Sequence, residues 1–337
     1  MGLTKIRRKF GSQLFSYGKR VAPPIISIGL VSWLIWSITP EKLAATFSTR
    51  TSLWLVLATA IQVVVLFTWD TVSLWWLFSQ PHQSLPFGMV FRARADTIVW
   101  SAVNLEIGQG VFAWKLAQIT ASSVQAALGR CLVLALFDFG TLMSLALVGS
   151  FLKPDPFIRS LRWICVAAIA GLLVAILTLR FLPTSWRRWL TRQDWARWLD
   201  WWSWRHSLLL WGQRVILFLL VLIYAGVGLT ICRIPVDART VAGVIPFVLL
   251  AESLPGTAGL GERETALVYL LHVQDDQRAV VLQFGLTWSV VVILGRVVIS
   301  LVSWWILPTQ SSKENSSDER SSPVELTQRQ GHNPESA

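Results

Sequence analysis

The stretch that decides the fold is Glu252-Ser253-Leu254-Pro255-Gly256-Thr257-Ala258-Gly259-Leu260-Gly261-Glu262-Arg263-Glu264. It places four ionisable side chains, three glycines and one proline within sequence that is otherwise apolar enough to enter a membrane. An ionised side chain at the centre of a membrane-spanning helix costs roughly 2.5–3.5 kcal/mol on insertion scales. Proline and glycine also break helices, and the backbone groups that they free cannot face lipid. We therefore expect this segment to be buried in protein or to line a watery cavity, and we take it as the candidate functional centre.

The composition predicts an all-α polytopic membrane protein. Of the 337 residues 53% are hydrophobic and 15% are charged, and apolar runs long enough to cross a hydrocarbon core of about 30 Å recur along the chain. The net charge of +11 comes from arginines and lysines in the N-terminus and the loops. Positive charge on the cytoplasmic side and contact with anionic lipid headgroups explain it, so we expect no nucleic-acid partner. The expected location is the plasma (inner) membrane.

Six apolar runs are predicted to be full spans: residues 21–38, 53–78, 131–151, 161–182, 215–231 and 280–307. Residues 1–20 are basic and precede the first run without a clear cleavage site, which predicts a signal anchor with a cytoplasmic N-terminus. Residues 308–337 are rich in Ser, Glu, Asn and Gln and are predicted to be a disordered cytoplasmic tail. The membrane domain is therefore expected to cover residues 21–307.

Two further regions, residues 87–118 and 241–271, decide the topology. The loop 180–214 holds seven arginines and should be cytoplasmic. With the N-terminus inside, this loop reaches the cytoplasm only if residues 87–118 enter the membrane and return to the same side. In the second region, residues 241–254 would form a helix of about 21 Å, too short to span, before the break and a second short helix. Both regions are therefore predicted to be re-entrant hairpins of broken helices.

The same plan then occurs twice along the chain: two spans, one re-entrant hairpin and one span. Each half crosses the membrane an odd number of times, so the two halves are predicted to form an inverted repeat. Inverted repeats with broken helices in corresponding positions are typical of transporters, whose substrate site lies near the membrane midplane.

Residues 183–212 are predicted to form a cytoplasmic interfacial segment. Tryptophans and arginines alternate there, and Trp195, Trp198, Leu199 and Trp202 share one face of a helix. An amphipathic helix in the headgroup layer explains this pattern. It serves either as a simple anchor or as a recognition element for anionic lipid.

Within the opening stretch, Pro255 ends one helix, Gly259 and Gly261 allow a tight turn, and a new helix begins at Glu262. The amides and the dipole at this N-terminus, together with the guanidinium of Arg263, suit a lipid phosphate. Glu252 and Glu264 lie close enough in sequence to pair with Arg263. The cluster is therefore either a ligand site or an ion-pair network that only holds the hairpin.

Further charges lie in the apolar runs. Arg296 is in the middle of the last span, and we expect it to pair with Glu252, Glu262 or Glu264. The deeper polar residues of the first hairpin, which complete the candidate substrate-binding set, are Asn104, Glu106 and Lys115. Residues 92–96 are interpreted as a cytoplasmic rim, and Asp70, Arg130 and Asp138 are ranked lower because they lie near span ends, where long side chains reach the interface.

Signals of catalysis are missing from the sequence. The Gly-x-Gly at 259–261 follows no strand, no P-loop lysine is present, and the four histidines and three cysteines lack metal spacing. We expect no metal, no cofactor and no enzymatic activity.

The late motif, with Leu254, Pro255, Gly259, Gly261, Arg263 and Glu264, resembles that of the lysylphosphatidylglycerol synthase transmembrane region, or flippase-like, family of integral membrane proteins. An earlier motif of that family is matched by Asn104, Leu105 and Gly108. Glu106 stands there in place of the family's proline, and Lys115 supplies a basic charge.

The resemblance implies a membrane protein that binds an anionic phospholipid or translocates it between leaflets. Full-length synthases of that family also carry a soluble aminoacyl-transferase domain, and this sequence shows no counterpart, so we do not expect lipid aminoacylation by this chain alone. The alternative is an accessory subunit or an enzyme of polar-lipid or lipid-linked glycan synthesis, with a lipid-modifying transferase as partner. A purely structural membrane protein is the third reading.

Overall fold

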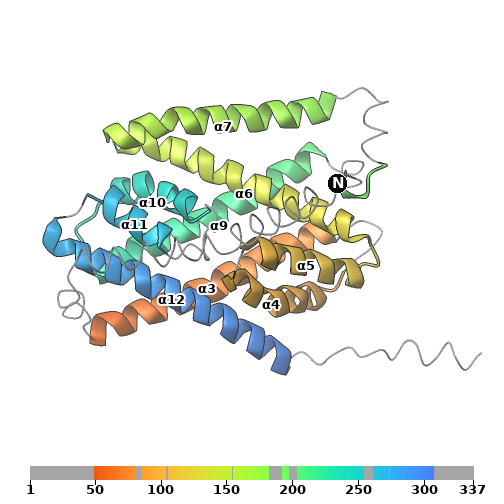
Figure 1. The fold of residues 1–337 in the computed structure, drawn as a ribbon, viewed down its shortest axis with the longest axis horizontal. Helices are drawn as coiled ribbons and strands as arrows, with labels where there is room; N and C mark the ends of the chain where they lie inside the picture. The colour runs from red at the N-terminus through yellow and green to blue at the C-terminus, as the bar shows by residue number, and fades with distance from the viewer. Residues whose placement is uncertain are drawn as a thin grey trace, which may run out of the picture.

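The computed structural model describes residues 49–79, 85–103, 105–153, 155–181, 192–196, 203–253, 261–272 and 274–306, and within these ranges every long regular element is an α-helix (Figure 1). The helices are α3 (Thr49–Phe78), α4 (Phe87–Val103), α5 (Leu105–Ile119), α6 (Val124–Leu152), α7 (Pro156–Phe181), α9 (Trp204–Ile231), α10 (Ala238–Glu252), α11 (Glu262–Leu270) and α12 (Asp275–Ile306).

Five of these helices, α3, α6, α7, α9 and α12, are long and apolar enough to cross a membrane. They confirm the expectation of a multi-pass helical membrane protein and match five of the six predicted runs. The remaining predicted run, residues 21–38, is the first along the chain. It lies outside the described residues, as do the N-terminus and the tail. The span of α9 begins at Trp204 rather than at residue 215, so the end of the predicted arginine-rich loop is helix. Of the predicted interfacial segment, the structure describes only residues 192–196 and the beginning of α9.

The four shorter helices form two pairs. We call α4 with α5 the first hairpin and α10 with α11 the second hairpin, because the two helices of each pair pack on one another. A polar side chain sets where α10 begins. Asp237 caps α10 by accepting a hydrogen bond from the backbone N–H of Thr240 at 2.9 Å. The hydrogen bonds from Thr240 also hold the pKa of the Asp237 carboxyl below its usual value.

The helix contacts repeat between the two halves of the chain. In the first half α4 packs on α3 and α12, and in the second half α10 packs on α9 and α6. Similarly α5 packs on α6 and α11 packs on α12, while α3 contacts α12 and α9 contacts α6. The helices α3 and α9 also pack on each other. Exchanging α3–α6 with α9–α12 therefore reproduces each of these contacts, whereas the contacts of α9 with α12 and of α6 with α7 have no counterpart.

Two apolar cores lie at opposite ends of this bundle. One core contains the end of α3, the start of α4, the end of α5 and the starts of α6 and α9, at Phe78, Val90, Leu116, Ala127 and Leu210. The other contains the start of α3, the ends of α6 and α9, and both helices of the second hairpin, at Leu55, Ala146, Leu229, Val244 and Leu267. Each hairpin therefore begins and ends at its own end of the bundle, and the two hairpins lie at opposite ends of the long axis in Figure 1.

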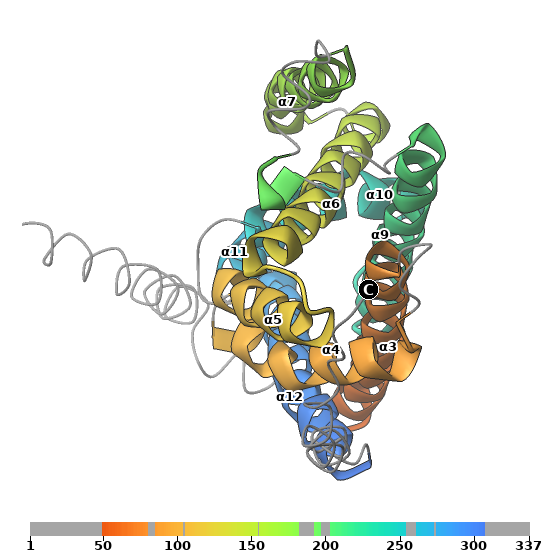
Figure 2. The same ribbon diagram turned by 90° about the vertical axis from the view of Figure 1, so that its right-hand side faces the viewer.

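The helix α7 lies at the edge of the bundle. Figure 2 shows it beside α6 and apart from the other helices. Most of its surface is exposed, including the large side chains of Trp163, Val174 and Phe181. In a soluble protein such a face would need a partner, but lipid tails cover it in a membrane.

The first hairpin is held by a close contact at a glycine. A Cβ atom added at Gly108 would lie 2.0 Å from the hydroxyl oxygen of Ser101 and 2.7 Å from its Cα, so the two helices meet at a distance that only glycine permits. Gly110 lies one half-turn further along α5, and a Cβ atom there would meet nothing within 4 Å.

This difference gives a matched pair of variants. We expect Gly108→Ala to force α4 and α5 apart and to destabilise the protein by about 1–3 kcal/mol. Gly110→Ala should leave the stability unchanged or raise it slightly, because alanine favours a helix by up to about 1 kcal/mol. Thermal unfolding of the purified protein in detergent measures both effects, and equal melting temperatures for the two variants would contradict the packing described here.

Candidate functional site

The second helix of the second hairpin begins after a glycine. Gly261 has a φ of 96°, which favours glycine, and it is the N-cap of α11. The side chain of Glu264 reaches back and accepts a hydrogen bond from the Gly261 N–H at 2.7 Å. This bond holds Glu264 inside the protein, where its side chain is fully buried.

Arg263 follows in the first turn of α11 and is 3% exposed. Its guanidinium lies 3.4 Å from the carboxylate of Glu252 and donates a short hydrogen bond to the Ser289 hydroxyl. Its Nε lies 4.0 Å from Oε1 of Glu264, and the Ser289 hydroxyl donates to that same oxygen. The ring of Trp288 lies under the guanidinium, with 4.6 Å between the guanidinium carbon and the ring centroid. Two carboxylates, a hydroxyl and an aromatic face therefore surround Arg263, although its Nε makes no hydrogen bond within the described residues.

Lys115, the basic candidate in the first hairpin, also has a carboxylate partner. Lys115 forms a short ion pair with Asp96 of α4, and Nε of Arg92 lies 3.9 Å from the same carboxylate. Lys115 lies towards the end of α5, away from the turn of the hairpin. Asn104, Pro255 and Gly259 lie outside the described residues, and so does the side chain of Glu106. The structure therefore does not place these four candidates.

Arg296 of α12 differs from the other two basic candidates. Its guanidinium donates to the backbone carbonyl of Ser101, near the end of α4, at 3.4 Å. The expected ion pair with Glu252, Glu262 or Glu264 does not form, since no carboxylate of the described residues lies within ion-pair distance of Arg296. The reason is that Glu252 and Glu264 are engaged with Arg263.

Both hairpins contact the same side of α12. Ser289, which contacts the tip of the second hairpin, and Arg296, which contacts the end of α4, are two helical turns or about 10.5 Å apart on the same face. Of the predicted site residues, the structure brings together Glu252, Gly261, Arg263 and Glu264, while Arg296 lies two turns further along α12 and Lys115 lies apart.

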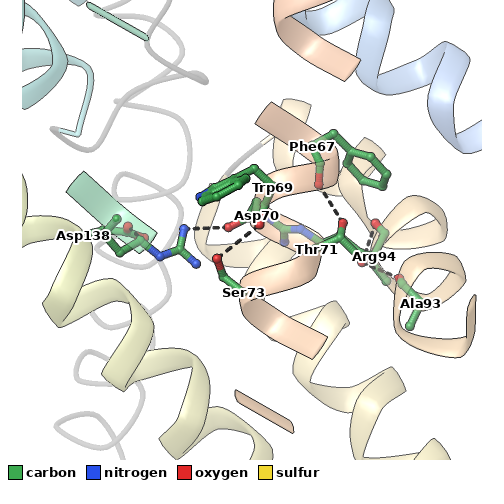
Figure 3. A network of polar contacts seen from close by, with 10 residues as sticks. Phe67, Trp69, Asp70, Thr71, Ser73, Ala93, Arg94 and Asp138 are labelled. Carbon is green, nitrogen blue, oxygen red and sulfur yellow. Dashed lines mark hydrogen bonds and ion pairs between the residues drawn. The ribbon is translucent and has the colours of Figure 1, made fainter. Parts of the chain in front are cut away.

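A second polar cluster, which the sequence reading did not identify, joins four helices (Figure 3). Asp70 of α3 accepts hydrogen bonds from Arg94 of α4 at 2.9 Å and from Arg214 of α9 at 2.8 Å. Nε of Arg214 also lies 3.4 Å from the carboxylate of Asp138 on α6. Arg214 is 1% exposed, so this arginine belongs to the interior of the bundle. We call these four residues the charge network.

The charge network corrects two of the sequence interpretations. Arg214 is not part of a cytoplasmic loop, because α9 begins ten residues before it. Arg94 is not a rim residue, because its side chain is 12% exposed and bonded to Asp70. Asp70 and Asp138, which the sequence analysis ranked low, both contact Arg214. The sequence does contain a signal of this pairing. Two acidic and two basic residues lie within or beside apolar runs, and charges at such positions usually pair with one another.

The described residues hold no group of three or more His, Cys, Asp or Glu side chains that could bind a metal ion. The three cysteines are buried and free. Within this part of the chain, the candidate site therefore consists of protein charges, hydroxyls and backbone groups.

No protein-family model, no curated protein and no solved structure matches this chain.

The position of Ser289 between Arg263 and Glu264 can be tested with a matched pair of serines. Ser289→Ala should leave two buried charged groups without their shared hydroxyl and should cost about 1–3 kcal/mol of stability. Ser253→Ala is the control, because Ser253 is exposed and bonds only to the carbonyl of Leu250 in its own helix. Unfolding in detergent should show a lower melting temperature for the first variant alone. Equal stability of the two variants would show that Ser289 does not bridge the pair.

Proposed function

We propose that this protein binds the phosphate of an anionic phospholipid at Arg296 and moves the lipid between the two leaflets of the membrane. The observation that carries the proposal is the contrast between Arg296 and the other arginines of the two hairpin tips and the charge network. Arg94, Arg214 and Arg263 each contact a carboxylate, whereas Arg296 contacts a carbonyl oxygen. A cation at this depth is costly unless an anion compensates it. A lipid phosphate is an anion that the membrane itself supplies.

The arrangement of the hairpins supports movement rather than binding alone. We interpret both hairpins as re-entrant segments that enter from opposite faces of the membrane, because each begins and ends at its own end of the bundle. The repeated contacts then correspond to an inverted repeat, and Arg296 lies on the face of α12 that both hairpins contact. Transporters built from inverted repeats hold their substrate at such a position and open it to each side in turn.

The resemblance of the late motif to the flippase-like family supports the same function, although we propose a structural role for the residues of that motif. Arg263 and Glu264 pair with each other and with their surroundings, so we assign them to holding the second hairpin in place. Arg296, which is not part of that motif, is assigned to the ligand. We further propose that the protein lies in the plasma (inner) membrane with both termini in the cytoplasm, in keeping with the arginine-rich region before α9.

A lipid translocation assay tests this function. The purified protein in liposomes should move a fluorescent anionic phospholipid between leaflets, as measured by quenching from the outside. Arg296→Ala should slow this movement about tenfold or more, because it removes a charged hydrogen-bond donor worth roughly 1.5–3 kcal/mol. Arg296→Lys should retain part of the activity.

The control variant is Arg278→Ala, on the exposed surface near the start of the same helix, which should behave as the wild type. Undiminished movement in Arg296→Ala would contradict the role of this residue. Absence of movement in the wild type would contradict translocation and favour a lipid-binding subunit of a synthetic enzyme.

A further inference from the structure

The two carboxylates of the charge network are held very differently. Asp70 accepts one hydrogen bond on each oxygen, at 2.8 and 2.9 Å. Asp138 has a single ion contact, 3.4 Å from Nε of Arg214, and its Oδ1 atom has no hydrogen-bond partner within the described structure. Its side chain is 33% exposed against 18% for Asp70. Asp138 is therefore the carboxylate that can take up a proton with the smaller loss of contacts.

The surroundings of Asp138 contain few other charges. The ionisable groups that act on it are Arg214 of α9, Asp70 of α3 and Arg94 of α4. The remaining helices packed on α6, namely α5, α7 and α10, bring no further ionisable side chain of the described residues to it. With both carboxylates ionised, the four members of the network balance to zero charge. When a proton binds to one carboxylate, the net charge of the network rises from zero to +1 within apolar surroundings.

The contacts indicate which helix a proton would release. Without the charge of Asp138, Arg214 keeps its bond to Asp70, and Asp70 keeps its bond to Arg94. These bonds hold α9, α3 and α4 together whatever the state of Asp138. The contact of Arg214 with Asp138 is the ion pair that ties α6 to this unit. Because α5 and α10 both pack on α6, a change in its position reaches both hairpins.

We propose that Asp138 is a proton-binding site and that its protonation releases α6 from α9. The ionised form holds the two helices together through Arg214. In the protonated form, the bonds of Asp70 still join α3, α4 and α9, and α6 can move. This inference goes beyond the proposed lipid function and does not depend on it, because proton binding and helix release can both be measured without lipid movement.

Infrared difference spectroscopy of the purified wild type in detergent tests proton binding. A protonated carboxyl group in an apolar setting should appear as the pH is lowered, and Asp138→Asn should remove that band. Asp155→Asn is the matched control, since Asp155 lies in the connection between α6 and α7 and outside the charge network, and it should keep the band. If Asp138→Asn does not fold, Asp138→Glu should keep a titrating band and shift its frequency.

Thiol labelling tests the release of α6. Cys131 lies two turns before Asp138 on α6, is 4% exposed, and belongs to the same apolar core as Leu210 of α9. In a protein with Cys165→Ala and Cys232→Ala, a membrane-permeant maleimide should modify Cys131 several times faster when Asp138→Asn is present, at one fixed pH. Asp155→Asn should not change the rate.

Three results would overturn the inference. A wild type without a titrating carboxyl band excludes a proton site, and a band that survives in Asp138→Asn assigns the proton to another residue. A labelling rate of Cys131 that is the same with and without Asp138→Asn excludes the release of α6.

Discussion

The structure depends on one constraint: a charge inside an apolar bundle must be compensated. Arg263 is compensated by Glu252, Glu264 and Ser289, and Arg214 by Asp70 and Asp138. Losing one partner of a buried pair costs about 3–5 kcal/mol, so these contacts determine which helices can lie side by side. They join α10, α11 and α12 at one end of the bundle and α3, α4, α6 and α9 towards the other. Among the described residues, Arg296 of α12 contacts the carbonyl oxygen of Ser101 and no carboxylate, which is why we propose it as the ligand-binding cation.

Two glycines determine how the helices that carry the charged side chains are placed. Gly261 turns the chain so that Glu264 can cap its own helix, and Gly108 brings α4 and α5 into contact. With the hairpins fixed in this way, Arg263 of one and Ser101 of the other contact the same face of α12. The repeated helix contacts then make the two ends of the bundle structurally alike, although the charge pairs are not repeated in sequence.

Much of this fold could be predicted from the sequence, because hydropathy and helix-breaking residues act locally. Five of the predicted spans were found, and the break near Gly261 occurs where glycine and charge interrupt an apolar run. The pairing of charges could not be predicted, because it depends on which helices meet. Arg214 and Asp70 are 144 residues apart, and Arg263 and Ser289 are 26 apart on different helices. Sequence position therefore suggested a loop for Arg214 and a carboxylate for Arg296, and both expectations were wrong for the same reason.

The most direct test of this account is native mass spectrometry of the protein purified from membranes that contain both anionic and zwitterionic phospholipids. If Arg296 binds an anionic phospholipid at the face of α12 that both hairpins contact, the wild type and Arg278→Ala will retain that lipid, and Arg296→Ala will lose it. Equal retention of the anionic lipid by Arg296→Ala would contradict the account.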